Sequence, residues 1–123
     1  MTTGERVVAK RIGREELGLH ELLHTRQLCH PNLVEFKGTA DTMPAHMCLL
    51  LEFCVGGSLD SWIRRRGRLS EDQVRVLSHD LMQGVGYLHR HGLAHCDIKP
   101  GNLLLAGGGI VKLADFGSMH SDA

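Results

Sequence analysis

Residues 93–117 read LAHCDIKPGNLLLAGGGIVKLADFG, and this stretch decides the fold. It contains two short apolar runs, at 103–105 and 110–113, which are separated by Ala-Gly-Gly-Gly at 106–109. A glycine-rich connection between two short apolar runs is typical of a β-hairpin. We therefore expect two antiparallel strands here, with one polar loop before the first strand and another after the second.

These two loops carry the side chains that we expect to do chemistry. Asn102 and Asp115 are 13 residues apart, and the hairpin would return one beside the other. Amide and carboxylate oxygens suit Mg²⁺, which keeps waters and phosphates as its other ligands. Asp97 could accept a proton from an attacking hydroxyl near that metal. Lys99 could offer a positive charge to a phosphate group in transfer.

The rest of the chain alternates between strand-like and helix-like patterns. Pro31 ends the first helical pattern, because proline cannot continue a helix and disfavours helical backbone in the residue before it. The elements that we expect are a strand at 6–12, a helix at 14–28, strands at 33–37 and 47–53 joined by a polar stretch at 38–46, a short helix at 59–66 capped by Ser58, and a long helix from Ser70 to His91.

Both of the longer helices are expected to bury an apolar face. In the first, Leu17, Leu22 or Leu23, and Leu28 recur near one side. In the second, Ser70 and Gln73 predict a capping box, and Gly92 falls where a left-handed residue ends a helix. The apolar stripe of this second helix is Val74, Leu77, Leu81, Val85 and Leu88.

Length and charge exclude several classes of protein. The chain has 123 residues, enough for one domain, with 14 Lys+Arg against 14 Asp+Glu. This balance disfavours a dedicated nucleic-acid binder. The apolar run at 47–51 is far too short to span a membrane, and the N-terminus has no signal sequence. Four cysteines without a C-x-x-C spacing predict reduced thiols, and hence a cytoplasmic protein.

Residues 95–102 followed by Asp115-Phe116-Gly117 resemble the catalytic loop and the D-F-G magnesium loop of protein kinases. Upstream, 7–10 resembles the strand with the phosphate-binding lysine, 30–34 the turn after the αC helix, and 51–59 the hinge. The resemblance implies an α+β, partial protein-kinase-like fold. Its parts would be an N-lobe portion at 1–51 without a Gly-rich loop, a hinge at 52–57, and a C-lobe portion at 58–123 that ends just after D-F-G.

The family implies roles for the residues that carry the chemistry. Lys10 would pair with Glu21 and hold the α- and β-phosphates of ATP. Asp97 would be the catalytic base, and Lys99 would steady the γ-phosphate. Mg²⁺ would be held by Asn102 and Asp115. A lysine two residues after the catalytic aspartate is the serine/threonine-kinase pattern, so the implied partner is a protein with a serine or threonine hydroxyl.

The same resemblance implies an adenosine site. The carbonyl of Glu52 and the amide of Cys54 would hydrogen-bond adenine, with Leu51 as the gatekeeper behind it. Ser58 would lie near the ribose, and Leu104 would support the adenine ring from the large-lobe side.

The sequence also departs from the kinase pattern. No G-x-G-x-x-G precedes Lys10, the chain ends six residues after Gly117, and Cys96 replaces an arginine. Lys10 and Glu21 are closer in sequence than usual, which suggests a shortened αC helix. We therefore expect a kinase domain truncated at both ends, inactive and marginally stable alone. The alternative is a non-catalytic, pseudokinase-like interaction module.

Other features have simpler interpretations. The densest candidate zinc group, His89, His91, His95 and Cys96, lacks a recognised ligand spacing. His95 is instead expected to pack near Phe116, as it does in the family. The arginines at 64–66 are expected to form a solvated helix end.

Overall fold

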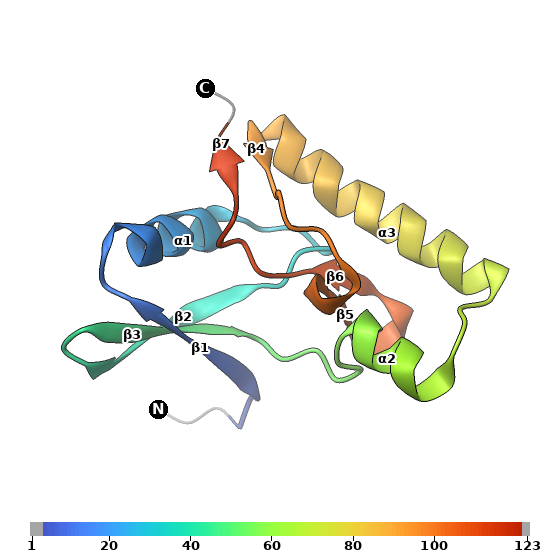
Figure 1. Cartoon of the computed structure of the whole chain (residues 1–123), viewed down its shortest axis with the longest axis horizontal. Coiled ribbons are helices and arrows are strands. Elements are labelled where there is room, and N and C mark those ends of the chain that lie inside the picture. Colours follow the sequence, from blue (N-terminus) through green and yellow to red (C-terminus); the bar gives the residue numbers. More distant parts are fainter. Residues whose placement is uncertain (1–3, 122–123) are drawn as a thin grey trace.

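The computed structural model describes residues 4–121 and shows an α+β arrangement, as expected (Figure 1). A three-stranded antiparallel sheet with strand order β1-β3-β2 is followed by a mainly helical part. The first part consists of β1 (Val7–Gly13), α1 (Glu16–Gln27), β2 (Phe36–Met43) and β3 (His46–Glu52). The second consists of α2 (Leu59–Arg66), α3 (Glu71–Arg90), β4 (Leu93–Ala94), β5 (Leu103–Leu105), β6 (Val111–Leu113) and β7 (His120–Ser121), with short 3₁₀ turns at Pro100–Asn102 and Gly107–Gly109.

The hairpin predicted from residues 103–113 is confirmed. β5 and β6 pair antiparallel, with Leu103 opposite Leu113 and Leu105 opposite Val111. The backbone amide of Ala114 then donates to the carbonyl of Asn102 at 2.8 Å. The hairpin therefore returns the loop after β6 to the residue immediately before β5, as the spacing predicted.

The prediction for the second strand was wrong in its position. β2 begins at Phe36 and continues to Met43, through most of the stretch expected to be a polar linker. Its pairing with β3 is interrupted by register shifts near Gly38 and between Asp41 and Met43, so the alternation of side chains that marks a strand is broken there. The apolar residues Leu33 and Val34 lie outside β2.

Those two residues connect the sheet region to the hairpin instead. Leu33 forms an isolated parallel bridge with Leu113, and the Val34 amide donates to the carbonyl of Leu113 at 3.0 Å. Both side chains are almost fully buried. Burial in the core therefore explains why both residues are apolar. Their apolar character does not indicate a strand at these positions.

The expected apolar face of this first helix is only partly correct, because Leu28 is buried and Leu22 packs against buried apolar residues of the sheet, whereas the other leucines are exposed. Leu17 is 76% exposed and Leu23 is 58% exposed. The buried side of this helix consists of residues three or four positions apart, namely Gly18, Glu21, His24 and Thr25. This face includes the Glu21 carboxylate, which pairs with Lys10 of β1.

The long helix follows its sequence signals closely. The Gln73 amide donates to Ser70 Oγ at 3.1 Å, and the Ser70 amide donates to Gln73 Oε1 at 2.8 Å, which completes the capping box. Gly92 has φ of 71°, the left-handed backbone expected after the last turn. The α2 cap is present as well, because Ser58 Oγ accepts from the Ser61 amide at 3.1 Å.

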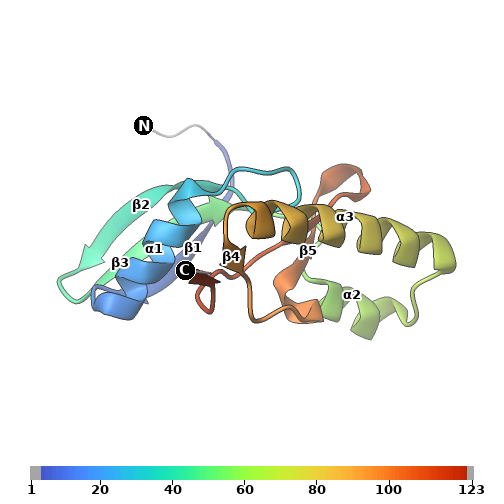
Figure 2. The ribbon, with the colours of Figure 1, turned by 90° about the horizontal axis from the view of Figure 1, so that it is seen from above.

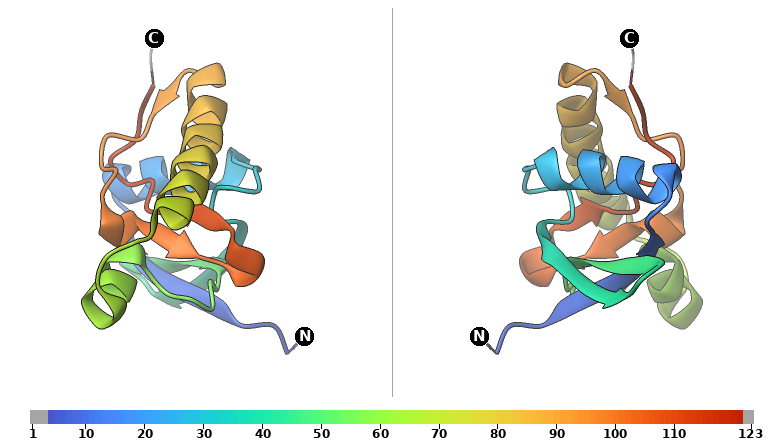
Figure 3. Two further views of the ribbon diagram at one scale, coloured as in Figure 1. Left: turned by 90° about the vertical axis from the view of Figure 1, so that its right-hand side faces the viewer. Right: turned by 90° about the vertical axis from the view of Figure 1, so that its left-hand side faces the viewer.

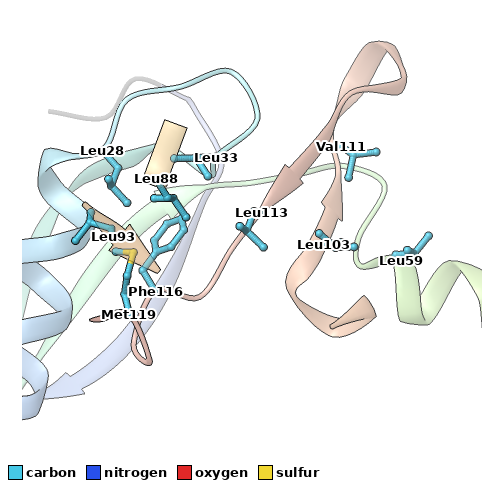
Figure 4. Packing of buried hydrophobic residues seen from close by; sticks show 10 residues of the cluster. All are labelled: Leu28, Leu33, Leu59, Leu88, Leu93, Leu103, Val111, Leu113, Phe116 and Met119. Atoms are coloured by element: carbon cyan, nitrogen blue, oxygen red, sulfur yellow. The ribbon is translucent and has the colours of Figure 1, made fainter. Parts of the chain in front are cut away.

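The main core lies where α3, the hairpin and the segment after it meet (Figures 3 and 4). Its fully buried members include Leu33, Leu88, Leu113 and Met119. A smaller cluster of Ile12, Met47 and Leu49 lies in the sheet part. Among the described residues, no helix is both long and apolar enough to cross a membrane.

Candidate active site

A cavity of about 290 Å³ lies between the sheet part and the hairpin. Six separate segments line it: β1, α1, the connection between α1 and β2, the end of β3, β5, and the three residues after β6. Six of the residues expected at the site meet here, namely Lys10, Glu21, Leu51, Glu52, Leu104 and Asp115. Sequence reasoning did not assign the other lining residues, such as Thr25 and Val34, because each is an ordinary helix or core residue by local pattern.

An ion-pair network crosses this cavity. Lys10 Nζ lies 2.5 Å from Glu21 Oε2 on α1 and 3.1 Å from Asp115 Oδ1 after β6. Asp115 is 105 positions from Lys10 in the sequence. The pairing of Lys10 with Glu21, expected from the resemblance, is therefore present despite their short separation in the sequence.

This network changes the proton affinity of its members. Burial opposes the charge on the Lys10 ammonium, but hydrogen bonds and charges from Glu21 and Asp115 outweigh it, and the pKa of Lys10 is raised. Burial likewise opposes ionisation of Asp115, yet the hydrogen bond and charge of Lys10 and the Gly117 amide hold the pKa of Asp115 below its usual value. Near neutral pH, Lys10 is a cation and Asp115 is an anion.

The loop that carries Asp115 is held by His95. Asp115 has φ of 63°, a left-handed conformation that is unusual for a residue with a side chain. The next residue, Phe116, is buried and meets the His95 ring edge-on, with 5.8 Å between ring centroids. His95 Nε2 also lies 2.8 Å from the carbonyl of Ala114. The structural role predicted for His95, with its ring near Phe116, is confirmed.

Asp97 is positioned by Asn102. The side-chain nitrogen of Asn102 donates to the Asp97 backbone carbonyl at 2.8 Å and to Asp97 Oδ2 at 3.1 Å. Lys99 Nζ lies 3.7 Å from the same carboxylate oxygen. Among the described residues, no group donates to Asp97 Oδ1. The preceding residue, Cys96, has φ of 69° and an exposed side chain.

The hinge-like end of β3 carries a contact that the sequence did not predict. Lys112 Nζ on β6 lies 2.7 Å from Glu52 Oε2, and Glu52 Oε1 accepts from the Glu35 amide at 3.0 Å. Lys112 and Glu52 are both largely buried. Because they are 60 residues apart, no local pattern could have paired them.

Two residues expected to contact adenosine lie beside the cavity rather than in its lining. Cys54 is buried, and burial raises the pKa of its thiol. Its backbone amide donates to no residue that the structure describes. Ser58 caps α2 and forms an isolated bridge with Leu104, which places it next to the cavity-lining strand β5.

The side chains expected to bind a metal offer oxygen atoms, which suit magnesium better than zinc. No group of three or more His, Cys, Asp or Glu side chains in the described part of the chain could hold a metal ion. Magnesium does not need such a cage, because it takes one or two carboxylates and completes its shell with waters and phosphates. The carboxylate of Asp115 and the amide oxygen of Asn102 fit that requirement.

Comparison with known proteins identifies the family. The family model for the protein kinase domain matches residues 2–121, nearly the whole chain. This chain belongs to the protein kinase family. The α+β arrangement, a small β-sheet followed by helices, is therefore a partial kinase fold.

Curated proteins similar to this kinase chain include serine/threonine kinases and a cell division control protein. It is 40% identical over 104 residues to serine/threonine-protein kinase RUNKEL of Arabidopsis thaliana, covering 85% of this chain and 8% of that protein. It is 43% identical over 101 residues to human serine/threonine-protein kinase TAO3, covering 81% of this chain and 11% of that protein. A third relative is cell division control protein 7 of Schizosaccharomyces pombe, 40% identical over 92 residues, covering 75% of this chain and 9% of that protein. The chain thus spans about a tenth of the length of the relatives it matches.

Proposed function

We propose that this chain binds ATP with Mg²⁺ in the cavity beside Lys10 and serves the transfer of phosphate to a serine or threonine hydroxyl of a protein. The observation that carries the proposal is the double ion pair of Lys10 with Glu21 and Asp115. Three different segments converge to build it, one of them about a hundred residues from the other two, and the ion pairs lie in a cavity open to a ligand. The division into an N-lobe portion, a hinge and a C-lobe portion belongs to the same proposal.

Lys10 and the hinge residues would bind the nucleotide. Glu21 holds the Lys10 ammonium in the cavity, where it would meet the phosphates as a fixed positive charge. Leu51 and Leu104 would enclose the adenine ring. The carbonyl of Glu52 and the amide of Cys54 would form hydrogen bonds with the edge of that ring. The ion pair of Glu52 with Lys112 keeps this end of β3 close to β6.

Asp97 would act on the hydroxyl of the substrate. Because Asn102 donates to Asp97 Oδ2, and Lys99 lies on the same side, Oδ1 is the atom left to accept the proton. Lys99, with an ammonium that is largely exposed, would steady the transferring phosphate.

The metal ligands would be Asp115 and Asn102. Lys10 and the Gly117 amide both bond Asp115 Oδ1, which leaves Oδ2 for a cation. When bound, Mg²⁺ neutralises phosphate charge and ATP supplies the phosphoryl group. Positioning and electrostatic stabilisation, rather than covalent chemistry by the protein, would then accelerate the transfer.

The decisive experiment is a calorimetric titration of the chain with MgATP. Lys10→Met should weaken binding at least about tenfold, because it removes the cation that meets the phosphates. Arg11→Met is the matched control, since Arg11 is the next residue of β1, is exposed, and does not line the cavity. Equal affinities for wild type and Lys10→Met, with unchanged circular dichroism, would refute the proposed nucleotide site.

The same titration tests the metal ligand. Asp115→Ala should weaken nucleotide binding in the presence of Mg²⁺ much more than in EDTA, because it deletes a metal ligand. Lys10→Met should weaken binding in both conditions. If wild type and Asp115→Ala respond to Mg²⁺ to the same extent, Asp115 is not a metal ligand.

A further inference from the structure

The histidines of α1 form a second contact with the segment after D-F-G, apart from the Lys10 network. His20 Nε2 lies 3.2 Å from the carbonyl oxygen of Met119. The rings of His20 and His24 meet edge to face, with 4.1 Å between their centroids. β7 carries a third histidine, His120, and lies beside α1 (Figures 1 and 2). We call His20, His24 and His120 the histidine cluster.

His24 is the buried member of this cluster. It is 9% exposed, and its Nδ1 atom is buried without a hydrogen-bond partner among the described residues. A neutral imidazole can leave Nδ1 with only a lone pair, whereas the protonated ring carries an N–H at both nitrogens. Protonation would therefore bury a donor that has no acceptor, which is unfavourable. The structure accommodates His24 as the neutral imidazole.

His20 differs, because its contact survives in either protonation state. The Met119 carbonyl can only accept, so Nε2 of His20 is the donor. Both the neutral ring with its proton on Nε2 and the charged ring provide this donor. The sensitivity of the cluster to protons therefore lies in His24.

The surroundings of His24 also oppose a positive charge. Burial lowers the pKa of the His24 imidazole, and positive charge on His20 or His120 lowers it further. Among the described residues, no carboxylate forms an ion pair with a histidine of the cluster. The acidic side chains on α1 and on the neighbouring elements are paired with other cations, namely Glu21 and Asp115 with Lys10, Asp41 with Arg14, and Glu35 with Lys37.

The cluster and the Lys10 network join the same two segments. Glu21 lies between His20 and His24 in the sequence of α1. Asp115 lies five residues before His120. A change in the packing of α1 against residues 116–121 therefore displaces the two carboxylates relative to each other, and these carboxylates share one ammonium group.

We propose that the histidine cluster is a proton-sensitive contact, which holds α1 against residues 116–121 while His24 is neutral and opens when His24 takes up a proton. Opening exposes the charged imidazole to water and loosens the ion pairs of Lys10. The resulting loss of nucleotide affinity rests on the function proposed above. Because the pKa of His24 in the folded state lies below the ordinary 6.5, the stabilising contribution is complete above 6.5 and is lost as pH falls below it toward the folded value.

The test is amide hydrogen exchange of the full chain between about pH 7.5 and 5.5, with rates corrected for the intrinsic pH dependence of exchange. We expect the protection of residues 117–121 to fall as pH drops. The limit is about tenfold per pH unit for one proton that binds only when the contact is open. Residues 103–113 of the hairpin are the internal reference, and they should keep their protection because the rest of the molecule stays folded.

Three variants assign the effect to the cluster. In His24→Leu the fall in protection should disappear, because leucine fills the buried position without a titratable group. His120→Gln is at an exposed position, so it tests the cluster without altering the core, and it should reduce the fall. His46→Gln is the control, since His46 lies on β3 and its side chain forms no hydrogen bond or ion pair with a described residue. It should respond as the wild type does.

A calorimetric titration with MgATP measures the consequence for the nucleotide. At the lower pH the wild type should bind several-fold more weakly than His24→Leu, whereas at the higher pH the two should bind equally. The protonation of ATP itself affects both proteins alike, so the comparison at one pH isolates the contribution of the protein.

Three results would overturn the proposal. One is protection of residues 117–121 that does not change with pH, or that falls equally in the wild type, His24→Leu and His120→Gln. A second is an equal fall in residues 103–113, which would show global unfolding. The third is equal MgATP affinity of the wild type and His24→Leu at the lower pH. A wild type that binds no MgATP at either pH would contradict the proposed function instead, and the exchange measurements do not depend on that function.

Discussion

Lys10 lies between two carboxylates that come from different parts of the chain, and its charge holds them together. The side chain of Glu21 is only 12% exposed, so removing its cation would leave a nearly buried carboxylate without a partner. Unpaired buried charge is strongly unfavourable. At the scale of single residues, the proposed contact with the nucleotide and the stability of the site therefore depend on the same ammonium group of Lys10.

The stabilising effect of Lys10 should depend on pH. Because its folded-state pKa is raised above the ordinary 10.5, its contribution is fully present below that value and is lost as pH rises through the folded pKa. Asp115 has a depressed folded pKa, so its contribution is present above its ordinary 3.8 and is lost as pH falls through the folded value.

The measurement is urea unfolding of wild type and Lys10→Met across the pH range. We expect the difference in free energy of unfolding to be largest between about pH 5 and 10 and to shrink on either side. If the difference in free energy of unfolding stays constant up to the highest pH at which both proteins fold, the charge of Lys10 does not contribute to stability.

A second residue-scale prediction concerns Asp97. In a preparation that transfers phosphate, Asp97→Asn should lower turnover about 10²–10⁴-fold, because the amide cannot accept the proton. ATP affinity should change little, because Asp97 is not among the residues that line the cavity beside Lys10, where we propose that ATP binds. The assay is transfer of labelled phosphate to a generic serine/threonine substrate, with the exposed Asp41→Asn as control. Near-normal turnover in Asp97→Asn would show that Asp97 is not the catalytic base.

At the scale of elements, the backbone of α3 lies very close to the backbone of the segment between α1 and β2. A side-chain carbon added at Gly84 would lie 3.0 Å from the carbonyl oxygen of Asn32 and 3.4 Å from Leu33 Cδ2. That carbonyl accepts the Leu113 amide at 2.8 Å, so it cannot move without disturbing β6. Glycine is needed here for space rather than for backbone freedom.

Gly84 and Gly86 offer a matched test of this contact. Gly84→Ala should lower the free energy of unfolding by about 1–3 kcal/mol through overpacking, despite the higher helix propensity of alanine. Gly86→Ala meets only the end of Arg90, so it should raise stability by about 0.5–1 kcal/mol. Chemical denaturation of the two variants provides the comparison. Stabilisation by both would show that α3 can shift away from Asn32 at little cost.

At the scale of the whole molecule, several large apolar side chains remain outside the core. On α3, Met82 is 71% exposed, while Leu88 on the same helix is fully buried. Leu17 and Leu23 of α1 are exposed as well. Exposed apolar side chains of this size favour association between copies, so we expect the chain to be marginally stable and to self-associate as its concentration rises.

Met82 tests that expectation. Met82→Gln should reduce self-association in sedimentation velocity while leaving the unfolding temperature almost unchanged, because the exposed side chain gains little from folding. Leu88→Gln, which places a polar group in the core, should lower stability by several kcal/mol. Unchanged self-association of Met82→Gln would exclude this face of α3 as the contact.

Sequence alone determined the parts of this kinase chain whose signals are local. The caps of α2 and α3, the left-handed residue after α3, and the β5–β6 hairpin all formed as predicted, because hydrogen bonds and turns within a few residues specify them. The hairpin also brought Asn102 next to the loop of Asp115, because the pairing of its two strands fixes the distance between the residue before the first strand and the residue after the second.

Tertiary structure decided whatever depends on partners that are distant in the sequence. Glu21 on α1 is buried because it pairs with Lys10 of β1, and an amphipathic pattern cannot reveal a charge that is paired with another element. The pairing of Lys10 with Asp115 and of Glu52 with Lys112 likewise spans 105 and 60 residues. A buried charge is tolerated only where the fold supplies its counter-ion, so the positions of such charges follow from the folded structure and not from the local sequence.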